Sequence, residues 1–182
     1  MENISGITSE CFNALTQLRE LDGPIVSPEQ IHARLCGFVD ALRERARDQG
    51  MSQRDADDTA YAIVALADEI AMVKPEPLGT YWMSQPLQLK YFNENQAGEG
   101  FFRKIAELQK DARRFDVLRI YYQCLLFGFQ GRYSMRGGDL ELMRIIDGLR
   151  PEIVSHVASP KSAAIASTNS GHADDGTSEP CS

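Results

Sequence analysis

Apolar residues recur every three or four positions over most of the first 157 residues, which is the period of amphipathic helices. This spacing predicts helices over about 9–22, 28–49, 52–73, 99–112 and 116–129, and a last one from Asp139 through Leu149. Pro75, Pro77 and Gly79 interrupt the pattern, and a short helix is expected from about Pro86. Alternating runs typical of strands do not stand out. The sequence therefore predicts an all-α fold of six to eight helices.

Start and stop signals fix several of these boundaries. Ser27 precedes Pro28, and Gln30 follows three residues after the serine, which is a capping pattern that opens a helix. Gly50 is expected to end that helix. Ser52, with Asp55 three residues later, is expected to open the next one.

The segment 116–129 is apolar on nearly every side, so it is predicted to be a central, buried helix that ends at Gly131. Gly128 would lie inside that helix, where glycine costs about 1 kcal/mol relative to alanine, which suggests close helix packing. Pro151 is expected to end or kink the last helix.

Beyond Val157 the chain is rich in Ser, Ala, Gly and Thr and has almost no large apolar side chains. Such a segment cannot bury enough surface to offset the entropy of ordering it. We therefore expect a folded domain over residues 1–157 and a disordered polar tail over 158–182.

The charge balance excludes one broad class of function. The chain carries 26 acidic and 19 basic side chains, a formal net charge of −7, which argues against general nucleic-acid binding. No run reaches the ~18 apolar residues of a membrane-spanning helix, and the N-terminus lacks the pattern of a secretory signal. These features predict a cytosolic, soluble body.

Motifs of known chemistry are missing from the sequence. It contains no phosphate-binding glycine loop, no nucleophile elbow and no HExxH motif. The spacing of Glu29 and His32 places a carboxylate and an imidazole on one helix face, but a di-iron bundle needs two such pairs. Four separated cysteines include no CxxC pair, and three of them lie on apolar helical stripes, where cysteine acts as a small hydrophobe. We therefore predict no catalytic residue, cofactor or metal site.

Two adjacent carboxylates, Asp68 and Glu69, lie in the most apolar part of a long predicted helix. In one interpretation they are structural anchors that accept hydrogen bonds from a loop or pair with an arginine such as Arg132. In the other, they form a perturbed acid in a cleft, as in an enzyme or a ligand-binding regulator.

Two further segments allow a structural and a functional interpretation. The turn from Phe92 to Phe102 crowds polar groups between aromatic residues, either to cap the next helix, with Glu99 favouring its N-terminus, or to present a loop to a protein partner. The segment Leu125–Tyr133 is aromatic at helical spacing, which is typical of a core and could also form an aromatic box.

Taken in order, these segments resemble the DotU/TssL family of bacterial secretion proteins. The resemblance rests on Leu66-Ala67-Asp68-Glu69, Trp82, Phe92-Asn93-Glu94, Gly98-Glu99, Phe101-Phe102 and the run from Leu125 to Tyr133, and it covers roughly residues 8–155. It implies a hook-like pair of small helical bundles without known chemistry.

The resemblance also implies a role in assembly. The chain would be a non-catalytic scaffold of a type VI secretion membrane complex at the cytoplasmic face of the bacterial inner membrane. It would bind an IcmF/TssM-type partner, baseplate subunits and often a second copy of itself. Asp68, Glu69, Glu99 and Arg132 would be structural polar anchors, and the candidate partner-binding residues are Asn93, Glu94, Asn95, Gln96, Gln130, Tyr133 and Arg136.

The sequence departs from the family pattern in two places. Gln130 stands where the family usually has glutamate, so an ion pair there would become a neutral hydrogen bond. Family members usually end in a transmembrane helix, whereas this chain ends in a polar tail, so membrane attachment is expected through an anchor absent from this chain. The competing hypothesis is a soluble helical enzyme or ligand-binding regulator with a pocket near Asp68 and Glu69.

Overall fold

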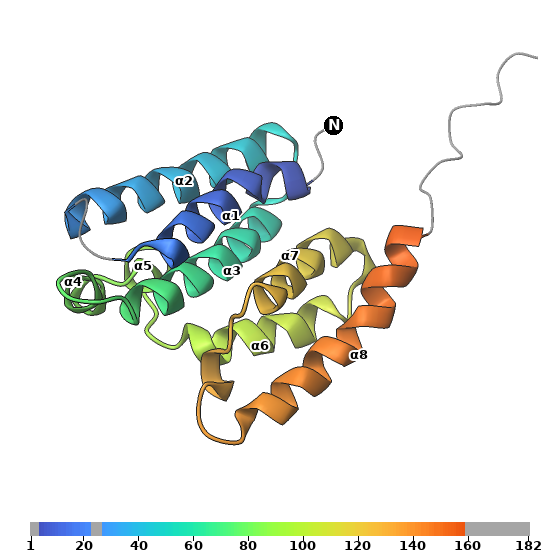
Figure 1. Cartoon of the computed structure of the whole chain (residues 1–182). Coiled ribbons are helices and arrows are strands. Elements are labelled where there is room, and N and C mark those ends of the chain that lie inside the picture. The colour runs from blue at the N-terminus through green and yellow to red at the C-terminus, as the bar shows by residue number, and fades with distance from the viewer. Residues whose placement is uncertain (1–3, 23–26, 159–182) are drawn as a thin grey trace, which may run out of the picture.

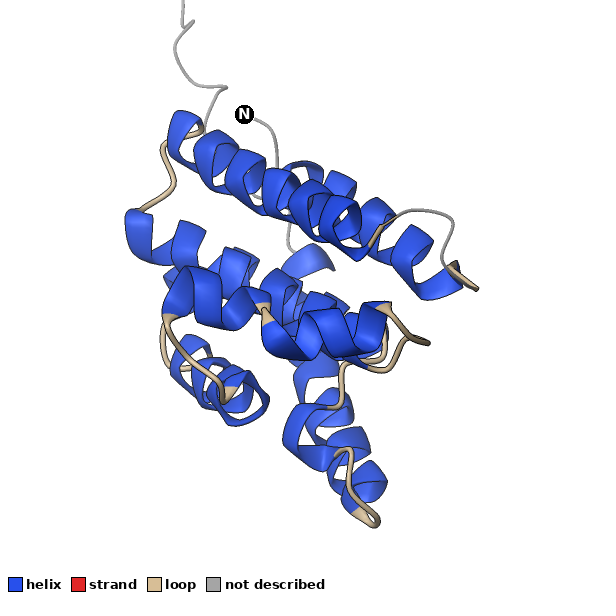
Figure 2. Ribbon diagram, turned by 90° about the vertical axis from the view of Figure 1, so that its left-hand side faces the viewer, coloured by secondary structure: helices blue, strands red, loops and turns tan. Residues whose placement is uncertain are grey.

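The structure is a computed structural model that describes residues 4–22 and 27–158. Regular structure within these ranges is entirely helical (Figure 2). The elements are α1 (Ile4–Glu20), α2 (Pro28–Asp48), α3 (Gln53–Met72), α4 (Leu78–Ser84), α5 (Leu87–Phe92), α6 (Ala97–Leu108), the 3₁₀ turn η1 (Ala112–Arg114), α7 (Phe115–Leu126), the 3₁₀ turn η2 (Gly131–Tyr133) and α8 (Gly138–Ala158). The all-α prediction is confirmed, and the predicted disordered tail over 158–182 lies, apart from its first residue, outside the described residues.

Helix α3 lies in the middle of the molecule, between two groups of helices (Figure 1). Helices α1 and α2 pack along one side of α3, together with the short helices α4 and α5. Helices α6 and α7 pack on another side, and α8 lies outside them against α7 and η2. This arrangement is the expected hook-like pair of small bundles, and a single hydrophobic core joins them.

The central position of α3 was not predicted, because its apolar residues are small. Helix α3 is buried on nearly every side from Ala56 to Ala71, whereas α7, the predicted centre, is buried but packs against fewer elements. Small side chains let neighbouring helices approach closely, yet they contribute little to a hydropathy pattern. The hydropathy pattern therefore predicted less burial for α3 than the structure shows.

The predicted helix starts are confirmed at atomic level. The Ser27 hydroxyl accepts a hydrogen bond from the backbone N–H of Gln30 at 3.2 Å, and Ser52 does the same for Asp55 at 3.1 Å. The Ser52 hydroxyl also donates to the Asp55 carboxylate at 2.7 Å. Gly50, just after α2, has φ = 77°, the left-handed conformation expected of a helix stop.

Some predicted boundaries are wrong. Helix α1 begins at Ile4 instead of residue 9, since Ile4, Ile7 and Cys11 extend the buried stripe. Helix α7 ends at Leu126, so Gly128 lies outside it with φ = 106° and is not a packing glycine inside a helix. Helix α4 was missed because it is only seven residues long and directly follows a proline-rich break, although Leu78 and Trp82 are both buried in the core.

Helix α8 passes through Pro151 and continues to Ala158. A proline inside a helix removes the hydrogen bond to the carbonyl four residues earlier, here that of Asp147. Both residues are exposed, so water can bind the freed carbonyl. Exposure therefore explains why this proline does not end the helix.

A buried ion-pair network, which the sequence did not reveal, joins the N-terminal half of α3 to the second bundle. The Asp58 carboxylate, in a residue only 6% exposed, accepts from Lys104 of α6 and from Arg114 of η1. Arg114 also donates from Nε to Asp55 at 2.6 Å, and Tyr121 of α7 donates to the Asp58 carbonyl at 2.8 Å. Since a buried charge must be paired, these contacts hold α6, η1 and α7 against α3.

The buried His32 of α2 lies against α4. Its Nε2 is 3.0 Å from the carbonyl oxygen of Gln85, and its ring packs edge-on against Trp82. Burial lowers the pKa of His32 below its usual 6.5, although the hydrogen bond to Gln85 opposes part of this change.

This environment predicts a pH-dependent stability. Because the pKa of His32 is lower in the folded protein, the unfolded chain binds more protons at this residue below pH 6.5. The contribution of His32 to the free energy of unfolding should be complete above pH 6.5 and should decline as the pH falls below it. Denaturant unfolding of the wild type and of His32→Gln at several pH values measures this contribution as their difference. A difference that stays constant or grows on acidification would contradict the prediction.

Candidate interaction surface and its polar anchors

Asp68 anchors the junction between α4 and α5. Its carboxylate has no exposed surface and accepts three hydrogen bonds: from Trp82 Nε1 at 2.7 Å and from the backbone N–H groups of Leu87 at 2.8 Å and Gln88 at 2.9 Å. Leu87 and Gln88 open α5, where backbone N–H groups have no partner within the helix. Asp68 therefore supplies acceptors to the start of α5 and fixes the buried Trp82 of α4.

Glu69 anchors a different segment. Its two carboxylate oxygens accept from the backbone N–H groups of Gln130 at 2.8 Å and Gly131 at 2.7 Å, at the entry to η2. Burial raises the pKa of both Asp68 and Glu69, and their N–H donors oppose part of that rise. The two neighbouring carboxylates thus bind two segments that are far apart in the sequence.

The turn between α5 and α6 carries four of the predicted partner-binding residues. Asn93 ends α5 in the left-handed conformation, with φ = 53°, and is exposed, as are Asn95 and Gln96. Glu94 is half-buried, because its carboxylate accepts a hydrogen bond from the hydroxyl of the buried Tyr61 at 2.9 Å. Glu94 therefore attaches the turn to α3, and the three amide side chains remain open to a partner.

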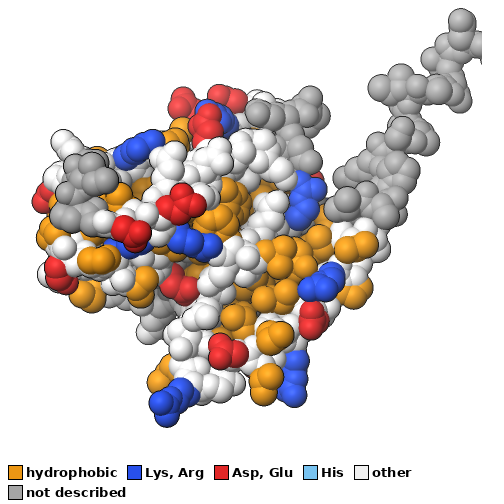
Figure 3. Space-filling model, viewed as in Figure 1, with side chains coloured by type: hydrophobic (Ala, Val, Ile, Leu, Met, Phe, Trp, Pro, Cys, Tyr) orange, Lys and Arg blue, Asp and Glu red, His pale blue; other side chains and the backbone are white. Residues whose placement is uncertain are grey.

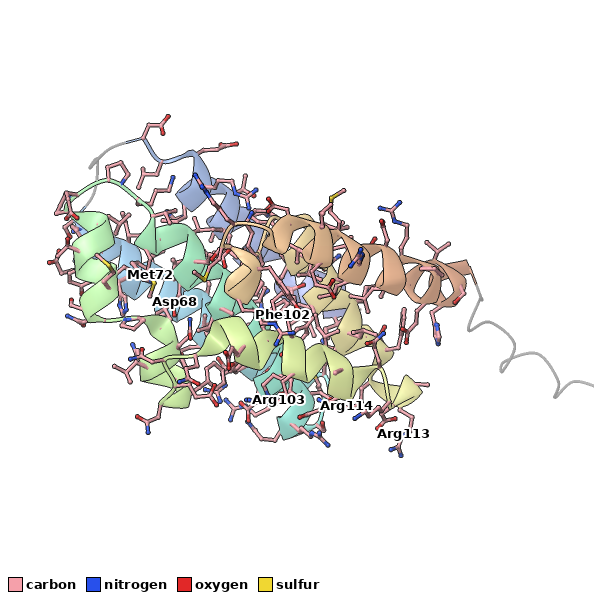
Figure 4. The ribbon with its side chains drawn as sticks, turned by 90° about the horizontal axis from the view of Figure 1, so that it is seen from below. Asp68, Met72, Phe102, Arg103, Arg113 and Arg114 are labelled. Atoms are coloured by element: carbon pink, nitrogen blue, oxygen red, sulfur yellow. The ribbon has the colours of Figure 1, made fainter. Side chains whose placement is uncertain are left out.

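The second group of predicted partner-binding residues lies in the segment Gln130–Arg136, which packs against the start of α6. A Cβ atom on Gly98 would be 3.2 Å from the backbone nitrogen of Arg132 and 3.3 Å from the carbonyl carbon of Gly131, so the two backbones are nearly in contact. The Tyr133 ring packs edge-on against Phe102 of α6, with ring centroids 4.8 Å apart; Figure 4 labels Phe102. The two loops therefore form one continuous surface, defined here as the two-loop surface, with Asn93–Gln96 on one part and Gln130–Arg136 on the other.

The remaining predicted residues take other positions. One alternative paired Arg132 with Asp68 or Glu69, but its guanidinium lies over the rings of Phe102 and Tyr133 and donates to the Tyr133 hydroxyl at 2.6 Å. Backbone N–H groups occupy the carboxylate oxygens, as the alternative with loop donors expected. Glu99 lies exposed in the first turn of α6.

Gln130 and Arg136 are also exposed, and Tyr133 is half-buried.

Two signals were missed by sequence reasoning. Tyr61 lies on α3 among small apolar residues, and its hydroxyl reaches across to Glu94. Gly100 lies directly beside it, since a Cβ atom on Gly100 would come within 2.0 Å of the Tyr61 hydroxyl oxygen. Only the contact with Tyr61 in the folded structure explains the glycine at position 100.

The two anchor carboxylates are engaged in structural hydrogen bonds. Across residues 4–22 and 27–158, no group of three or more His, Cys, Asp or Glu could hold a metal ion. Both oxygens of each anchor carboxylate are engaged by N–H donors, so neither Asp68 nor Glu69 faces a cavity as a free acid or base. The arrangement can position two loops, and their exposed polar side chains can bind another protein.

The anchors predict a loss of stability on neutral substitution. Asp68→Asn places an NH₂ group opposite an N–H donor in a buried site, so it should lower the free energy of unfolding by about 1–3 kcal/mol. Glu69→Gln, at a half-buried position, should cost less. Denaturant unfolding followed by Trp82 fluorescence measures both effects.

As a control, Glu44→Gln changes an exposed carboxylate on α2 and should stay within about 0.5 kcal/mol of the wild type. Asp68→Asn with the stability of this control would contradict the role of Asp68 as an anchor.

Gly100→Ala should displace Tyr61 and break its hydrogen bond to Glu94, because the added methyl group would overlap the hydroxyl. We expect a loss of about 1–3 kcal/mol in the free energy of unfolding and faster amide exchange in the turn at 93–96. Gly37→Ala is the matched control: α2 leaves open space at Gly37, so alanine should stabilise the helix by up to about 1 kcal/mol. Equal effects of the two substitutions would exclude the proposed contact.

Comparisons with known proteins agree with this geometry. The family model described as "Type VI secretion system protein DotU" matches residues 4–179. A search of curated proteins gives no match.

Solved structures of similar fold carry the same family names. The cytoplasmic domain of TssL from Acinetobacter baumannii is 26% identical, with a TM-score of 0.78 over 85% of this chain and 99% of that domain. SciP/TssL from enteroaggregative Escherichia coli 042 is 25% identical, with a TM-score of 0.68 over 90% of this chain and 95% of the other. TssL from Vibrio cholerae, at 23% identity, matches in fold with a TM-score of 0.72 over 84% of this chain and 95% of the other. The chain belongs to the DotU family of type VI secretion system proteins.

Proposed function

We propose that this chain is a non-catalytic scaffold of a bacterial type VI secretion membrane complex and binds an IcmF/TssM-type inner-membrane protein and baseplate subunits. The two-loop surface is the proposed contact region. The observation that carries the proposal is that hydrogen bonds to α3 fix both loops of a DotU-family protein, from Tyr61 to Glu94 and from Gly131 to Glu69, while leaving most of their polar side chains exposed. Binding to a preformed surface avoids the entropic cost of ordering the loops.

Exposed apolar side chains also support a protein-binding role. Leu140, Met143 and Val154 of α8 are 69%, 59% and 58% exposed, and Met135 in the second loop is 78% exposed. Hydrophobic side chains gather over α7 and α8 on the face shown in Figure 3. Contiguous exposed apolar surface is typical of protein contacts.

The proposed location is the cytoplasmic face of the inner membrane. In the part of the chain that the structure describes, no helix combines the length and the apolar character needed to cross a bilayer. We propose that the protein works attached to that membrane and that it also assembles as a homodimer.

The competing enzyme or regulator hypothesis needs a pocket at Asp68 and Glu69. Asp68 has no exposed surface, and a cavity of about 440 Å³ between α1 and α7 has neither Asp68 nor Glu69 in its lining. Its lining, which includes Ser5, Phe12 and Gln123, has no ionisable side chain that could act as an acid or base. These observations favour the scaffold hypothesis over that of an enzyme or ligand-binding regulator.

Charge changes on the two-loop surface test the proposed contact. Asn95→Lys, Gln96→Lys and Arg136→Glu change three exposed positions and leave the net charge unchanged. Combined, they should lower the amount of IcmF/TssM-type protein that co-purifies with the chain by at least about tenfold, because misplaced charges at an interface cost several kcal/mol.

A control variant with Glu44→Lys and Arg47→Glu also keeps the net charge and alters the exposed face of α2. It should retain the complex. If the triple variant folds, as judged by circular dichroism, and still co-purifies at the wild-type level, the two-loop surface does not bind this partner.

A further inference from the structure

The three cysteines in the described part of the chain have different surroundings. The Sγ atoms of Cys11 and Cys124 face the backbone carbonyls of Phe38 at 3.6 Å and Ala62 at 3.7 Å. A carbonyl accepts from the thiol and so favours the protonated form. Burial raises the pKa of Cys11 to about 12, with a further increase from Glu10, and also raises the pKa of Cys124. These two cysteines are therefore unreactive thiols.

Cys36 faces nitrogen atoms instead. Lys90 of α5 donates from Nζ to Cys36 Sγ at 3.0 Å, and His32, one turn earlier on α2, has Nδ1 at 3.7 Å from the same sulfur. Because His32 Nε2 contacts the Gln85 carbonyl, which can only accept, the ring proton belongs on Nε2. Nδ1 is then a bare acceptor that faces the thiol. A base oriented by a third group beside a thiol is the arrangement of an activated nucleophile.

The distance between Lys90 and Cys36 is held by neighbouring contacts. The hydroxyl oxygen of Tyr91, next to Lys90, lies 2.8 Å from the Asp40 carboxylate and 3.1 Å from the Cys36 carbonyl oxygen, and its one proton is shared between these acceptors, which fixes α5 against α2. Cys36 is 5% exposed and Lys90 is exposed, so the sulfur lies just beneath the surface at the lysine. Oxidation of this sulfur requires a small oxidant, such as hydrogen peroxide, to approach it from that side.

We propose that Cys36 is an oxidation-sensitive thiol whose sulfenic acid is captured by Lys90, which forms a covalent sulfur–nitrogen link between α2 and α5. The proposal concerns a modification site and does not depend on the proposed scaffold function. The sulfur–nitrogen link would restrain α5, which leads directly into the turn at 93–96.

The reaction needs one equivalent of hydrogen peroxide. In the first step the Cys36 sulfur attacks one peroxide oxygen: the S–O bond forms, the O–O bond breaks, and the thiol proton, received by His32 Nδ1, passes to the departing hydroxide to give water. Sulfur is oxidised to sulfenic acid and peroxide is reduced.

In the second step Lys90 Nζ, after losing one proton to solvent, attacks the sulfenic sulfur. The S–N bond forms, the S–O bond breaks, and the leaving hydroxide takes a second proton from nitrogen as water. The hydrogen bond to Cys36 raises the pKa of Lys90, and formation of the neutral sulfenic acid removes that stabilisation of the ammonium. The protein loses two hydrogen atoms in total.

The test is peptide mapping after treatment of the purified full chain with hydrogen peroxide. Remaining thiols are alkylated under denaturing conditions, and trypsin digestion is followed by mass spectrometry. The expected product joins peptide 35–43 to peptide 55–103, uncut after Lys90, with a mass two hydrogens below the sum of the two peptides. Dithiothreitol should separate them, and Cys11 and Cys124 should be recovered alkylated.

Lys90→Arg is the matched control, because it keeps a positive charge near the sulfur but removes the amine. In this variant Cys36 should be oxidised without any link and should be trapped by a sulfenic-acid reagent. The proposal is overturned if wild-type Cys36 is recovered fully alkylated, if it is oxidised without a link to Lys90, or if the three cysteines oxidise at the same rate.

Discussion

The two neighbouring carboxylates of α3 constrain the rest of the structure. A charge without access to bulk water must be satisfied by hydrogen bonds, and Asp68 has no exposed surface. Consecutive side chains on a helix point about 100° apart, so Asp68 and Glu69 reach different segments. Asp68 holds the junction of α4 and α5, and Glu69 holds the entry to η2. One position on the central helix thus fixes both the start of α5, which leads into the turn at 93–96, and the entry to the second loop.

The N-terminal half of α3 also carries carboxylates that hold neighbouring elements, but there the donors are side chains. Asp55 and Asp58 pair with Arg114, and Asp58 also pairs with Lys104, so the second bundle is attached by charges that would be left unpaired if it moved away. Figure 4 labels Asp68 and Arg114, which lie well apart in the molecule. Between these polar ends α3 presents alanines and other apolar residues to its neighbours. Packing supplies the core, and the buried carboxylates specify how the two bundles meet.

The sequence predicted what depends on local patterns. The helical period, the serine caps at 27 and 52 and the stop at Gly50 are encoded within a few residues, and they were predicted correctly. The sequence offered either a loop or an arginine such as Arg132 as the donor to Asp68 and Glu69. It could not identify which loop residues donate, since most of the donors are backbone N–H groups, which every non-proline residue has. The contact of Cys36 with Lys90 was also hidden, because 54 positions separate the two residues.

The hydrogen bond between Gln130 and Glu69 changes how the departure from the family pattern at residue 130 is interpreted. The resemblance implied that glutamine in place of glutamate weakens an ion pair. In the structure, however, it is the backbone N–H of Gln130 that binds Glu69, and its side chain is exposed. The anchor is therefore independent of the side chain at this position, and the difference in charge falls on the two-loop surface. Because the donor at this position is a backbone N–H group, the charge of side chain 130 can change without releasing the loop from Glu69.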